Sequence, residues 1–267
     1  MGANDRSIPV PSGDGTAGPR IARVEIGGRA LWVELRGDDV IEIGDRFDSP
    51  HRCAVIAQVS DVRFLPPIES HNQIIGIMGN FTKRTDRRGP GIFIKPITTI
   101  NAYGADVLWP ADVPNVCMES ELAVVIGKTA KNLSEAEALD CVFGYTVAND
   151  VTSFGVIQEE GVSSHSTRFK MYDTFLPLGP WIVTGITADH RRLTSRLNGQ
   201  PKQDILLTEL DFNVAQTVSW ISRVLTLRPG DVISMGTPPG FGDMADGDIV
   251  ECEIEGIGVL TNRIVKI

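Results

Sequence analysis

Residues 118–127 read Met-Glu-Ser-Glu-Leu-Ala-Val-Val-Ile-Gly, and this stretch constrains the fold more than any other part of the chain. A β-branched apolar run that ends at a glycine predicts a strand. Because side chains on a strand alternate between its two faces, Glu119 and Glu121 are expected to point the same way. Two neighbouring carboxylates repel each other unless a cation or a shared proton lies between them. The pair therefore marks either a cation site or two solvent-facing acids on an edge strand.

A third acid follows a second predicted strand. Residues 143–150 read Phe-Gly-Tyr-Thr-Val-Ala-Asn-Asp, so an apolar segment ends at Asp150. Between the two strands, a capping box begins at Ser134, with Glu137 three residues later, and predicts a helix over residues 134–142. A crossing of this kind lets the three acids converge. Oxygen ligands with room for water and substrate suit Mg²⁺ or Ca²⁺.

The composition is that of a globular protein and excludes several classes of partner. The 267 residues are 42% hydrophobic and 22% charged, which is enough to bury a sizeable core. A net charge of −9 argues against nucleic acids and anionic membranes as partners. No segment approaches 18 consecutive apolar residues, and the N-terminus lacks the apolar stretch of a signal peptide. The four cysteines are scattered, so we expect reduced thiols in a cytoplasmic protein.

The chain is predicted to divide into three parts. Residues 1–19 contain prolines and glycines with little apolar content, and we expect them to be disordered or loosely packed. Residues 20–67 predict a small N-terminal β domain, because two alternating segments flank Gly27 and Gly28 as in a hairpin. Residues 68–267 form the main domain.

Strand signals outnumber helix signals in the main domain, which indicates a mainly β fold with a few helices, in the α+β class. A second helix is expected over residues 214–225, where apolar side chains recur on one face. Asn198 and Gly199 predict a hairpin turn. Residues 152–168 are polar and predict a long loop, which within a compact domain is commonly functional.

A basic loop follows the first predicted strand of the main domain. Residues 73–81 are an apolar segment that ends in Gly-Asn-Phe, and residues 82–91 carry four basic side chains among glycines. Loops between strands are where binding and catalytic side chains often lie. In an acidic protein, this loop either receives an anionic substrate or is a solvated surface turn.

Seven short motifs follow one another from residue 119 towards the C-terminus. They are Glu119-x-Glu121-Leu-Ala-Val-Val-Ile-Gly, Gly144-Tyr145-Thr146-x-Ala-Asn149-Asp150, Lys170-x-x-Asp173-Thr-Phe, Leu178-Gly179-Pro180-Trp181, Pro229-Gly230-Asp231-Val-Ile, Gly236-Thr237-Pro238 and Glu255-Gly256-Ile257-Gly258. Each motif is weak alone, but the ordered series resembles the fumarylacetoacetate hydrolase family over about residues 68–267. This resemblance favours the cation-site interpretation of the paired glutamates.

The resemblance implies a mixed β-sandwich or β-roll for the main, catalytic domain, and a homodimer. It implies that Glu119, Glu121 and Asp150 bind Mg²⁺, with Mn²⁺ or Ca²⁺ as alternatives. In the same correspondence, Lys170 matches the active-site lysine of the family, and Thr237 matches a substrate-binding threonine. The implied substrate is a small anionic 2-oxo acid or β-dicarbonyl, which can chelate a cation and react through an enolate.

The basic loop departs from the family pattern. Members that hydrolyse C–C bonds carry Asn-Tyr-x-x-His-x-x-Glu after the first strand, whereas this chain has Asn80, Phe81, Arg84 and Arg87 at the corresponding positions. A guanidinium stays protonated near neutral pH and cannot act as a general base. Asp86 could replace the missing glutamate only if the loop shifts. We therefore interpret Arg84 and Arg87, together with Asn80, as substrate-binding residues that grip a carboxylate.

The segment after Asp150 departs as well. The Arg-Asp pair of the family appears here as Phe154-Gly155, so a substrate-anchoring arginine is missing. His165 lies in the expected loop and titrates in a useful pH range, which makes it a candidate catalytic residue beside its ordinary interpretation as a solvated side chain.

The sequence leaves two function classes open. In the first, a metal-dependent enzyme acts on a 2-oxo acid or β-dicarbonyl through an enolate, by C–C cleavage (hydrolysis or decarboxylation) or by enol–keto isomerisation. In the second, the chain is a binding module that keeps the metal without turnover. The intact acids, Lys170 and Thr237 favour the enzyme. Without the His-Glu dyad, we predict inefficient hydrolysis unless His165 or Asp86 supplies the base.

Overall fold

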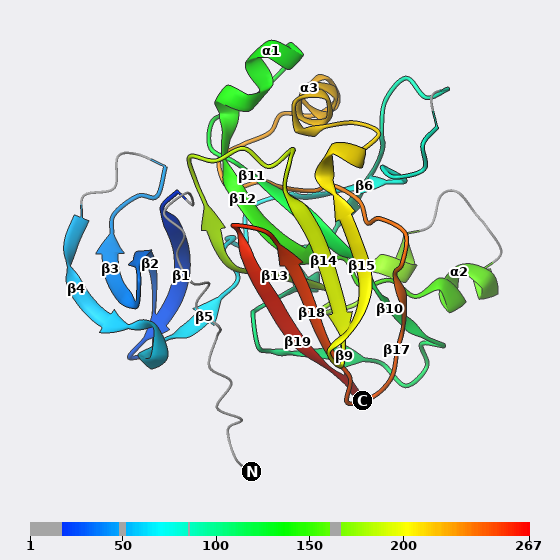
Figure 1. The fold of residues 1–267 in the computed structure, drawn as a ribbon, viewed down its shortest axis with the longest axis horizontal. Helices are drawn as coiled ribbons and strands as arrows, with labels where there is room; N and C mark the ends of the chain where they lie inside the picture. Colours follow the sequence, from blue (N-terminus) through cyan, green and yellow to red (C-terminus); the bar gives the residue numbers. More distant parts are fainter. Residues whose placement is uncertain (1–17, 48–51, 85, 161–166) are drawn as a thin grey trace.

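Strands dominate the structure, and a few helices accompany them (Figure 1). The computed structural model describes residues 18–47, 52–84, 86–160 and 167–267. The expectation for residues 1–19 therefore falls largely outside the described residues, as does His165. Within the described residues, the predicted class, mainly β with a few helices, is confirmed.

Most of the described strands belong to one long sheet. In spatial order, its main path consists of β4 (Arg52–Gln58), β3 (Asp39–Ile43), β2 (Arg29–Arg36), β1 (Arg20–Ile26), β13 (Leu176–Val183), β12 (Val142–Asn149), β11 (Ser120–Ile126), β16 (Val232–Ser234), β6 (Ile74–Met78) and β7 (Gly91–Lys95). Two short strands join this path, β5 (Arg63–Leu65) beside β1 and β8 (Ile100–Asn101) beside β13. Since β6 and β8 each run parallel to their neighbours β16 and β13, the sheet is mixed, as the resemblance implied.

A second sheet packs against the first, and much of the core lies between them (Figure 1). In spatial order its strands are β15 (Gln200–Leu206), β14 (Arg192–Leu197), β18 (Ile249–Ile254), β19 (Gly258–Lys266) and β9 (Asp106–Trp109). The turn between β14 and β15 contains Asn198 and Gly199 with φ angles of 51° and 77°. This is the hairpin turn that the Asn-Gly pair predicted.

A two-stranded sheet lies next to the start of β11. Strand β10 (Val116–Met118) pairs with β17 (Gly242–Met244), and Cys117 on β10 also bridges to Thr152. A single residue separates β10 from β11, a central strand of the long sheet. Glu119 is that residue, so it is held between two separately paired strands.

The N-terminal strands β1 to β5 curve away from the rest of the sheet, as the blue part of Figure 1 shows. Strands β1 and β2 form the predicted hairpin, with positive φ at Gly27 and Gly28. The first residues of β1 pair with β13, Arg20 opposite Val183. Backbone hydrogen bonds therefore continue from this region into the main sheet, while the domain boundaries themselves stay predictions.

Trp181 on β13 lies where these parts of the structure meet. Its side chain is buried, and its indole N–H donates a hydrogen bond to the carbonyl of Ile257 at 2.6 Å. Its ring lies 6.0 Å from the ring of Phe64 on β5. A large aromatic side chain with its polar atom satisfied stabilises a core strongly. Trp181 thus connects the N-terminal strands, the long sheet and the second sheet.

Two of the three described helices were expected from the sequence. Helix α1 (Glu135–Ala138) starts at the predicted capping box, in which the backbone N–H of Ser134 donates to the Glu137 carboxylate at 3.0 Å. It ends after one turn, so the prediction of a helix over residues 134–142 was too long. Helix α3 (Val214–Val224) is confirmed, with Asn213 as its N-cap. Short 3₁₀ turns cover Val59–Asp61, Ile97–Thr99, Leu139–Cys141, Arg168–Lys170 and Leu207–Glu209.

The third helix corrects the prediction of a loop over residues 152–168. Helix α2 (Phe154–Glu160) starts directly after Ser153, whose hydroxyl accepts a hydrogen bond from the backbone N–H of Val156 at 3.4 Å. An N-cap of this kind stabilises a helix start that composition alone does not reveal. The glycine in its first turn, Gly155, is what hid the helix signal in the sequence.

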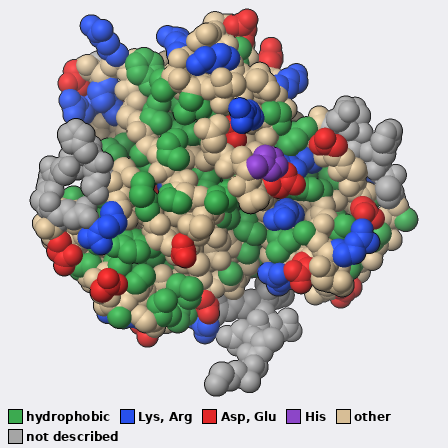
Figure 2. Space-filling model, turned by 180° about the vertical axis from the view of Figure 1, so that it is seen from behind, with side chains coloured by type: hydrophobic (Ala, Val, Ile, Leu, Met, Phe, Trp, Pro, Cys, Tyr) green, Lys and Arg blue, Asp and Glu red, His purple; other side chains and the backbone are tan. Residues whose placement is uncertain are grey.

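The charged side chains of both signs are interspersed on the face opposite to the view of Figure 1, as Figure 2 shows for the described residues. None of the helices in the described part of the chain has the length and apolar character needed to cross a membrane. The homodimer and the cytoplasmic location stay predictions.

Candidate metal centre

Three carboxylates converge as the sequence predicted. Strand β11 pairs with β12 in a register that sets Ser120 opposite Asn149 and Glu121 opposite Ala148. Just beyond this ladder, the backbone N–H of Asp150 donates to the carbonyl of Glu119 at 2.9 Å. Ligand atoms of Glu119, Glu121 and Asp150 all lie within 4.8 Å of one another, and all three side chains are buried.

Asn149 fixes the segment that carries Glu119. Its side-chain carbonyl accepts a hydrogen bond from the backbone N–H of Glu119 at 2.9 Å. Two hydrogen bonds in opposite directions thus join residues 149–150 to Glu119. This explains why an Asn-Asp pair is useful at this position: the amide orients the backbone, and the acid contributes to the site.

Two buried lysines face the three carboxylates. The ammonium of Lys170 donates to Glu119 at 2.6 Å and to Asp150 at 2.5 Å. The ammonium of Lys95 donates to the other oxygen of Asp150 and to the carbonyl of Phe175, the latter at 3.1 Å. Buried charges are tolerated in proteins when they are paired and hydrogen-bonded in this way.

Lys95 is a site residue that the sequence interpretation missed. It lies on β7, where Phe93 and Lys95 are buried while Ile94 between them is 45% exposed. The period of two therefore places the lysine on the inward face. The available signal was a lysine at the end of the apolar segment 91–95, but the pattern alone does not say which face of a strand is inward.

Burial and mutual charge shift the pKa values of these groups in different directions. Burial raises the pKa of Glu121 to about 8, and the neighbouring charge of Asp150 adds to the shift. Burial also raises the pKa of Glu119. For Asp150 burial acts in the same sense, but the two lysines outweigh it and lower its pKa. Burial would lower the pKa of Lys170, yet the surrounding carboxylates raise it above its ordinary value. Lys170 is therefore a stable positive charge.

Glu121 is oriented by strand β16 and the turn that follows it. Its carboxylate accepts hydrogen bonds from the hydroxyl of Ser234 at 2.6 Å and from the backbone N–H of Gly236 at 2.9 Å. Gly236 has φ of 92°, and a Cβ at this position would lie 3.0 Å from the Cβ of Asn80. Only glycine adopts this conformation in this space without strain, so the Gly236 N–H can reach the carboxylate.

The donor set fits a divalent cation. The three carboxylates carry up to three negative charges, and the two lysines compensate two of them. Burial, with repulsion from Asp150, raises the pKa of both Glu119 and Glu121, so a cation bound here would favour their ionised forms. Carboxylate oxygens on rigid strands are the ligands that Mg²⁺, Mn²⁺ and Ca²⁺ accept. A bound dication would therefore be held by these three side chains.

Thr237 lies next to the centre, on the turn after Gly236. Its hydroxyl donates to the carbonyl of Ser120 at 3.1 Å and accepts a hydrogen bond from the Gln203 side chain at 2.7 Å. The amide oxygen of Gln203 in turn accepts from Ser195 at 2.8 Å. Gln203 on β15 thus positions Thr237, and the sequence interpretation missed it. Substrate binding by Thr237 stays a prediction.

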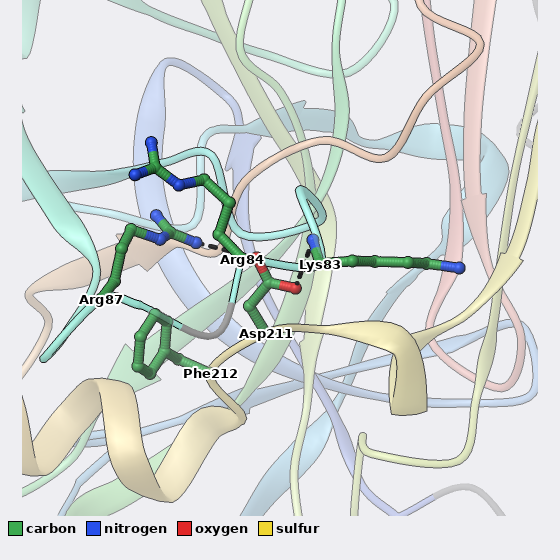
Figure 3. A pocket seen from close by; sticks show the side chains of 5 residues that line it. All are labelled: Lys83, Arg84, Arg87, Asp211 and Phe212. Carbon is green, nitrogen blue, oxygen red and sulfur yellow. Dashed lines mark hydrogen bonds and ion pairs between the residues drawn. The ribbon is translucent and has the colours of Figure 1, made fainter.

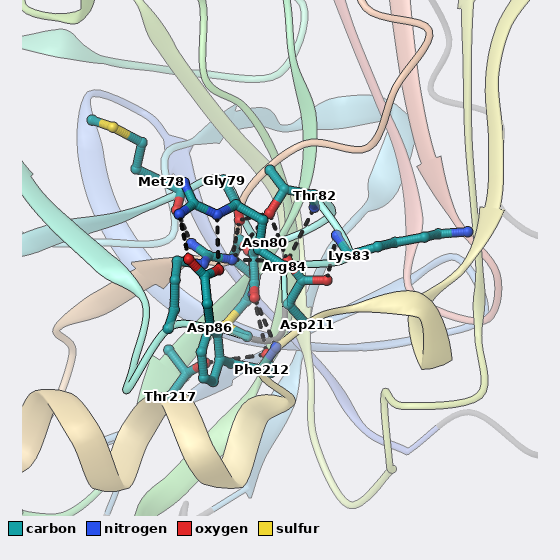
Figure 4. A network of polar contacts seen from close by, with 12 residues as sticks. Met78, Gly79, Asn80, Thr82, Lys83, Arg84, Asp86, Asp211, Phe212 and Thr217 are labelled. Atoms are coloured by element: carbon teal, nitrogen blue, oxygen red, sulfur yellow. Dashed lines mark hydrogen bonds and ion pairs between the residues drawn. The ribbon is translucent and has the colours of Figure 1, made fainter.

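Asn80, the second residue after β6, is buried (Figure 4). Its amide nitrogen donates to the carbonyls of Met235 at 2.9 Å and Phe212 at 3.1 Å, and its amide oxygen accepts from the N–H of Phe212 at 2.9 Å. These contacts hold Met235 in place and with it the adjacent Gly236, whose backbone N–H donates a hydrogen bond to Glu121. Direct contact between Asn80 and a substrate stays a prediction.

The basic loop lines a cavity of about 430 Å³, whose wall consists of Lys83, Arg84, Arg87, Asp211 and Phe212 (Figure 3). The guanidinium of Arg87 donates to Asp211 at 2.8 Å and to the carbonyl of Gly79 at 2.5 Å. Arg84 pairs with Asp86 at 2.8 Å, and its side chain is 60% exposed. Both arginines therefore reach the cavity, but Arg87 is also a structural cross-link. Their contact with a substrate stays a prediction.

Replacing Arg87 by alanine is expected to lower the free energy of unfolding by about 2 kcal/mol, because charged hydrogen bonds contribute roughly 1.5–3 kcal/mol when buried partners depend on them. Arg84→Ala in the same loop is the matched control, since an exposed ion pair contributes little. Urea denaturation of both variants measures the difference. Equal unfolding free energies for the two variants would contradict the cross-link.

Three comparisons identify the family. The family model described as "Fumarylacetoacetate (FAA) hydrolase C-terminal" matches residues 71–265. Oxaloacetate tautomerase Fahd2a, mitochondrial, from Rattus norvegicus is 32% identical over 246 residues, which cover 84% of this chain and 78% of the relative. The crystal structure of 5-carboxymethyl-2-hydroxymuconate delta-isomerase from Mycobacterium smegmatis is 36% identical with a TM-score of 0.86. The match covers 93% of this chain and 100% of that chain.

A further solved structure is maleylpyruvate hydrolase from Sphingobium sp. SYK-6 in complex with manganese(II) ion and pyruvate. It is 26% identical with a TM-score of 0.78, and the match covers 92% of this chain and 99% of that chain. The family model spans most of the chain and includes all three carboxylates and both lysines. This chain belongs to the fumarylacetoacetate hydrolase family of enzymes.

Proposed function

We propose that the protein is a divalent-metal-dependent enzyme that converts a small anionic 2-oxo acid or β-dicarbonyl through an enolate, with keto–enol tautomerisation as its main reaction. The observation that carries the proposal is the buried cluster of Glu119, Glu121 and Asp150 beside the Lys170 ammonium, with ligand atoms within 4.8 Å of one another. Mg²⁺ is the proposed cofactor, and Mn²⁺ and Ca²⁺ are the alternatives.

The residues of this chain have distinct tasks in the proposed reaction. When bound, the cation supplies a Lewis acid that polarises a carbonyl oxygen and offsets the charge of an enolate. The carboxylates around Lys170 raise its pKa in the metal-free protein, and in the proposed reaction its ammonium supplies a positive charge towards the developing oxyanion. Lys95, with no exposed side-chain surface, cannot touch a substrate and instead orients Asp150. Burial of the whole cluster strengthens these electrostatic interactions.

Tautomerisation is preferred over hydrolysis for a chemical reason. Hydrolysis of a C–C bond needs a general base that activates water for attack at carbon. Decarboxylation leaves the enolate as CO₂ departs, and tautomerisation only moves the acidified α-proton of the 2-oxo acid to solvent water and returns one proton to oxygen, so neither reaction needs that attacking water. Arginines stand at both positions where hydrolytic relatives carry the His-Glu dyad. The similarity to an oxaloacetate tautomerase and to a delta-isomerase supports the same choice. Manganese and pyruvate in the Sphingobium structure support a cation with a 2-oxo acid.

The test follows three products of one reaction mixture. Oxaloacetate and acetylpyruvate are incubated with the protein and Mg²⁺ in D₂O, and proton exchange at the enolisable carbon is followed by nuclear magnetic resonance beside CO₂ release and acid formation. Exchange is expected to depend on Mg²⁺ and to exceed hydrolysis roughly 100-fold or more, the usual contribution of a general base.

Each outcome separates two functions. Mg²⁺-dependent exchange without acid products supports the tautomerase, and fast CO₂ release supports the decarboxylase. Hydrolysis as fast as exchange would contradict the proposed reaction, and it would assign the missing base to another residue if it persisted in both His165→Ala and Asp86→Ala. Mg²⁺ binding without any exchange would instead show a binding module that lacks turnover.

A further inference from the structure

Two phenylalanines stack against each other on segments that pair with β10. Phe154, the first residue of α2, and Phe241, the residue before β17, have ring centroids 5.3 Å apart at an interplanar angle of 18°. Phe241 is 43% exposed, and Phe154 is half-buried. Stacked aromatic rings attract each other, but an exposed pair still leaves apolar surface in contact with water. The pair can therefore gain more by covering an apolar ligand.

Both rings are attached to segments that flank Glu119. Gly242, the neighbour of Phe241, pairs with Met118, the residue before Glu119. On the other side of the same short strand, Cys117 bridges to Thr152, two residues before Phe154. The two phenylalanines thus come from opposite sides of β10 and meet next to the end of the strand from which Glu119 emerges.

Asn115 holds the two segments in this arrangement. Its side-chain oxygen accepts a hydrogen bond from the N–H of Gly155 at 2.7 Å, at the start of α2, and its amide nitrogen donates to Asp243 on β17 at 2.6 Å. A Cβ on Gly155 would lie 2.6 Å from Pro114 and 2.9 Å from the Asn115 side-chain oxygen. Only a glycine lets the start of α2 approach Pro114 and Asn115 this closely, so the position of the Phe154 ring depends on Gly155.

The side chains that join the two segments by hydrogen bonds include one anion and no cation. The side chains that support the pair are Asn115, Cys117, Ser153 and Asp243, and none of these four carries a positive charge. The thiol of Cys117 donates a hydrogen bond to Asp243 at 2.9 Å. A substrate carboxylate beside these rings would meet the Asp243 carboxylate and find no cation among the supports. A phenyl or alkyl group would find two rings to pack against.

We propose that the Phe154–Phe241 pair binds the end of the substrate that is distant from its 2-oxo acid head, and that it selects an aryl or alkyl tail over a second carboxylate. The inference rests on the proposed function, because the head must be chelated beside Glu119 for the tail to reach the rings. The preferred substrates are then acylpyruvates or related 2-oxo acids with an apolar substituent, rather than dicarboxylates.

Inert oxamates test this assignment without depending on turnover. N-phenyloxamate, N-oxalylglycine and N-methyloxamate share one chelating head and differ in the tail, which is phenyl, carboxylate or a single methyl group. Their affinities for the protein with Mn²⁺ are measured by calorimetry. N-phenyloxamate is expected to bind at least about 10-fold more tightly than N-oxalylglycine, which corresponds to about 1.4 kcal/mol.

The variants change the tail site and spare the fold. Phe241→Ala and Phe154→Ala are each expected to reduce the ratio of the affinity for N-phenyloxamate to that for N-methyloxamate to about 3 or less. Phe154→Arg is expected to bind N-oxalylglycine more tightly than N-phenyloxamate. Leu139→Ala is the control, because Leu139 is also 43% exposed but lies on the distant Leu139–Cys141 turn. Thermal midpoints confirm that each variant is folded.

Two results would overturn the proposal in different ways. Mn²⁺-dependent binding of all three oxamates with no tail preference, or with a preference that both alanine variants retain, would remove the aromatic tail site and leave the proposed function standing. Absence of Mn²⁺-dependent binding for every oxamate would overturn the proposed function together with the tail site.

Discussion

Glu121→Gln is expected to lower the affinity for Mg²⁺ and Mn²⁺ by roughly 100-fold or more and to abolish metal-dependent exchange. The substitution removes one of three negative ligands. It preserves the fold, because a glutamine side-chain oxygen can accept the same hydrogen bonds from Ser234 and the N–H of Gly236. Calorimetric titration of the metal into variant and parent measures the loss. Glu135→Gln on the exposed side of α1 removes the same charge far from the centre and serves as the control.

The same variant also has a pH signature in the metal-free protein. Burial and the charge of Asp150 raise the pKa of Glu121 from 4.5 to about 8. A raised pKa stabilises the folded state fully below the unfolded value, and this contribution disappears as the pH rises through the folded value. In EDTA, the parent is therefore expected to lose stability between about pH 4.5 and pH 8, and Glu121→Gln is expected to lose less. Parallel stability profiles, together with unchanged metal affinity, would contradict the assignment of Glu121.

The convergence of the three carboxylates was predictable because it depends on regular geometry. The alternation of side chains along a strand placed Glu119 near Glu121, and the end of an apolar segment placed Asp150 beyond a strand. The predicted crossing between these two strands was expected to bring the acids together, and in the structure the ladder between β11 and β12 does so. Lys170 was found through its motif, since a single lysine in an irregular segment has no periodic signal.

The features that the sequence did not reveal depend on tertiary contacts. Lys95 became visible only when the inward face of β7 was known, because a strand pattern does not state which face is buried. Helix α2 depends on Ser153 as its cap and on Gly155 packing against Pro114, neither of which has a periodic signature. The use of Arg87 as a cross-link depends on Asp211, which lies 124 residues away in the chain. Contacts between distant segments decide whether a charged residue is free to bind a ligand.

Lys170→Met is expected to lower kcat for metal-dependent exchange by roughly 100-fold or more, the usual loss when one donor to a developing oxyanion is removed. Metal affinity is expected to be preserved or to rise, because the Lys170 ammonium contacts both Glu119 and Asp150 and repels a bound cation. Exchange kinetics at saturating Mg²⁺, beside a calorimetric titration, separate the loss of kcat from any change in metal binding. A near-normal kcat would show that Lys170 only balances the charge of the carboxylates.

Lys95→Met provides the matched comparison, since both lysines contact Asp150 but only Lys170 retains any exposed side-chain surface. Removing Lys95 deletes its buried hydrogen bonds to the carbonyl of Phe175 and to one oxygen of Asp150. Breaking a buried ion pair by deleting one partner destabilises a protein by about 3–5 kcal/mol. The main expected effect of Lys95→Met is therefore a loss of stability, whereas the main expected effect of Lys170→Met is a loss of turnover. Urea denaturation of both variants, with and without Mg²⁺, distinguishes the two lysines, and identical profiles would contradict the division of tasks between them.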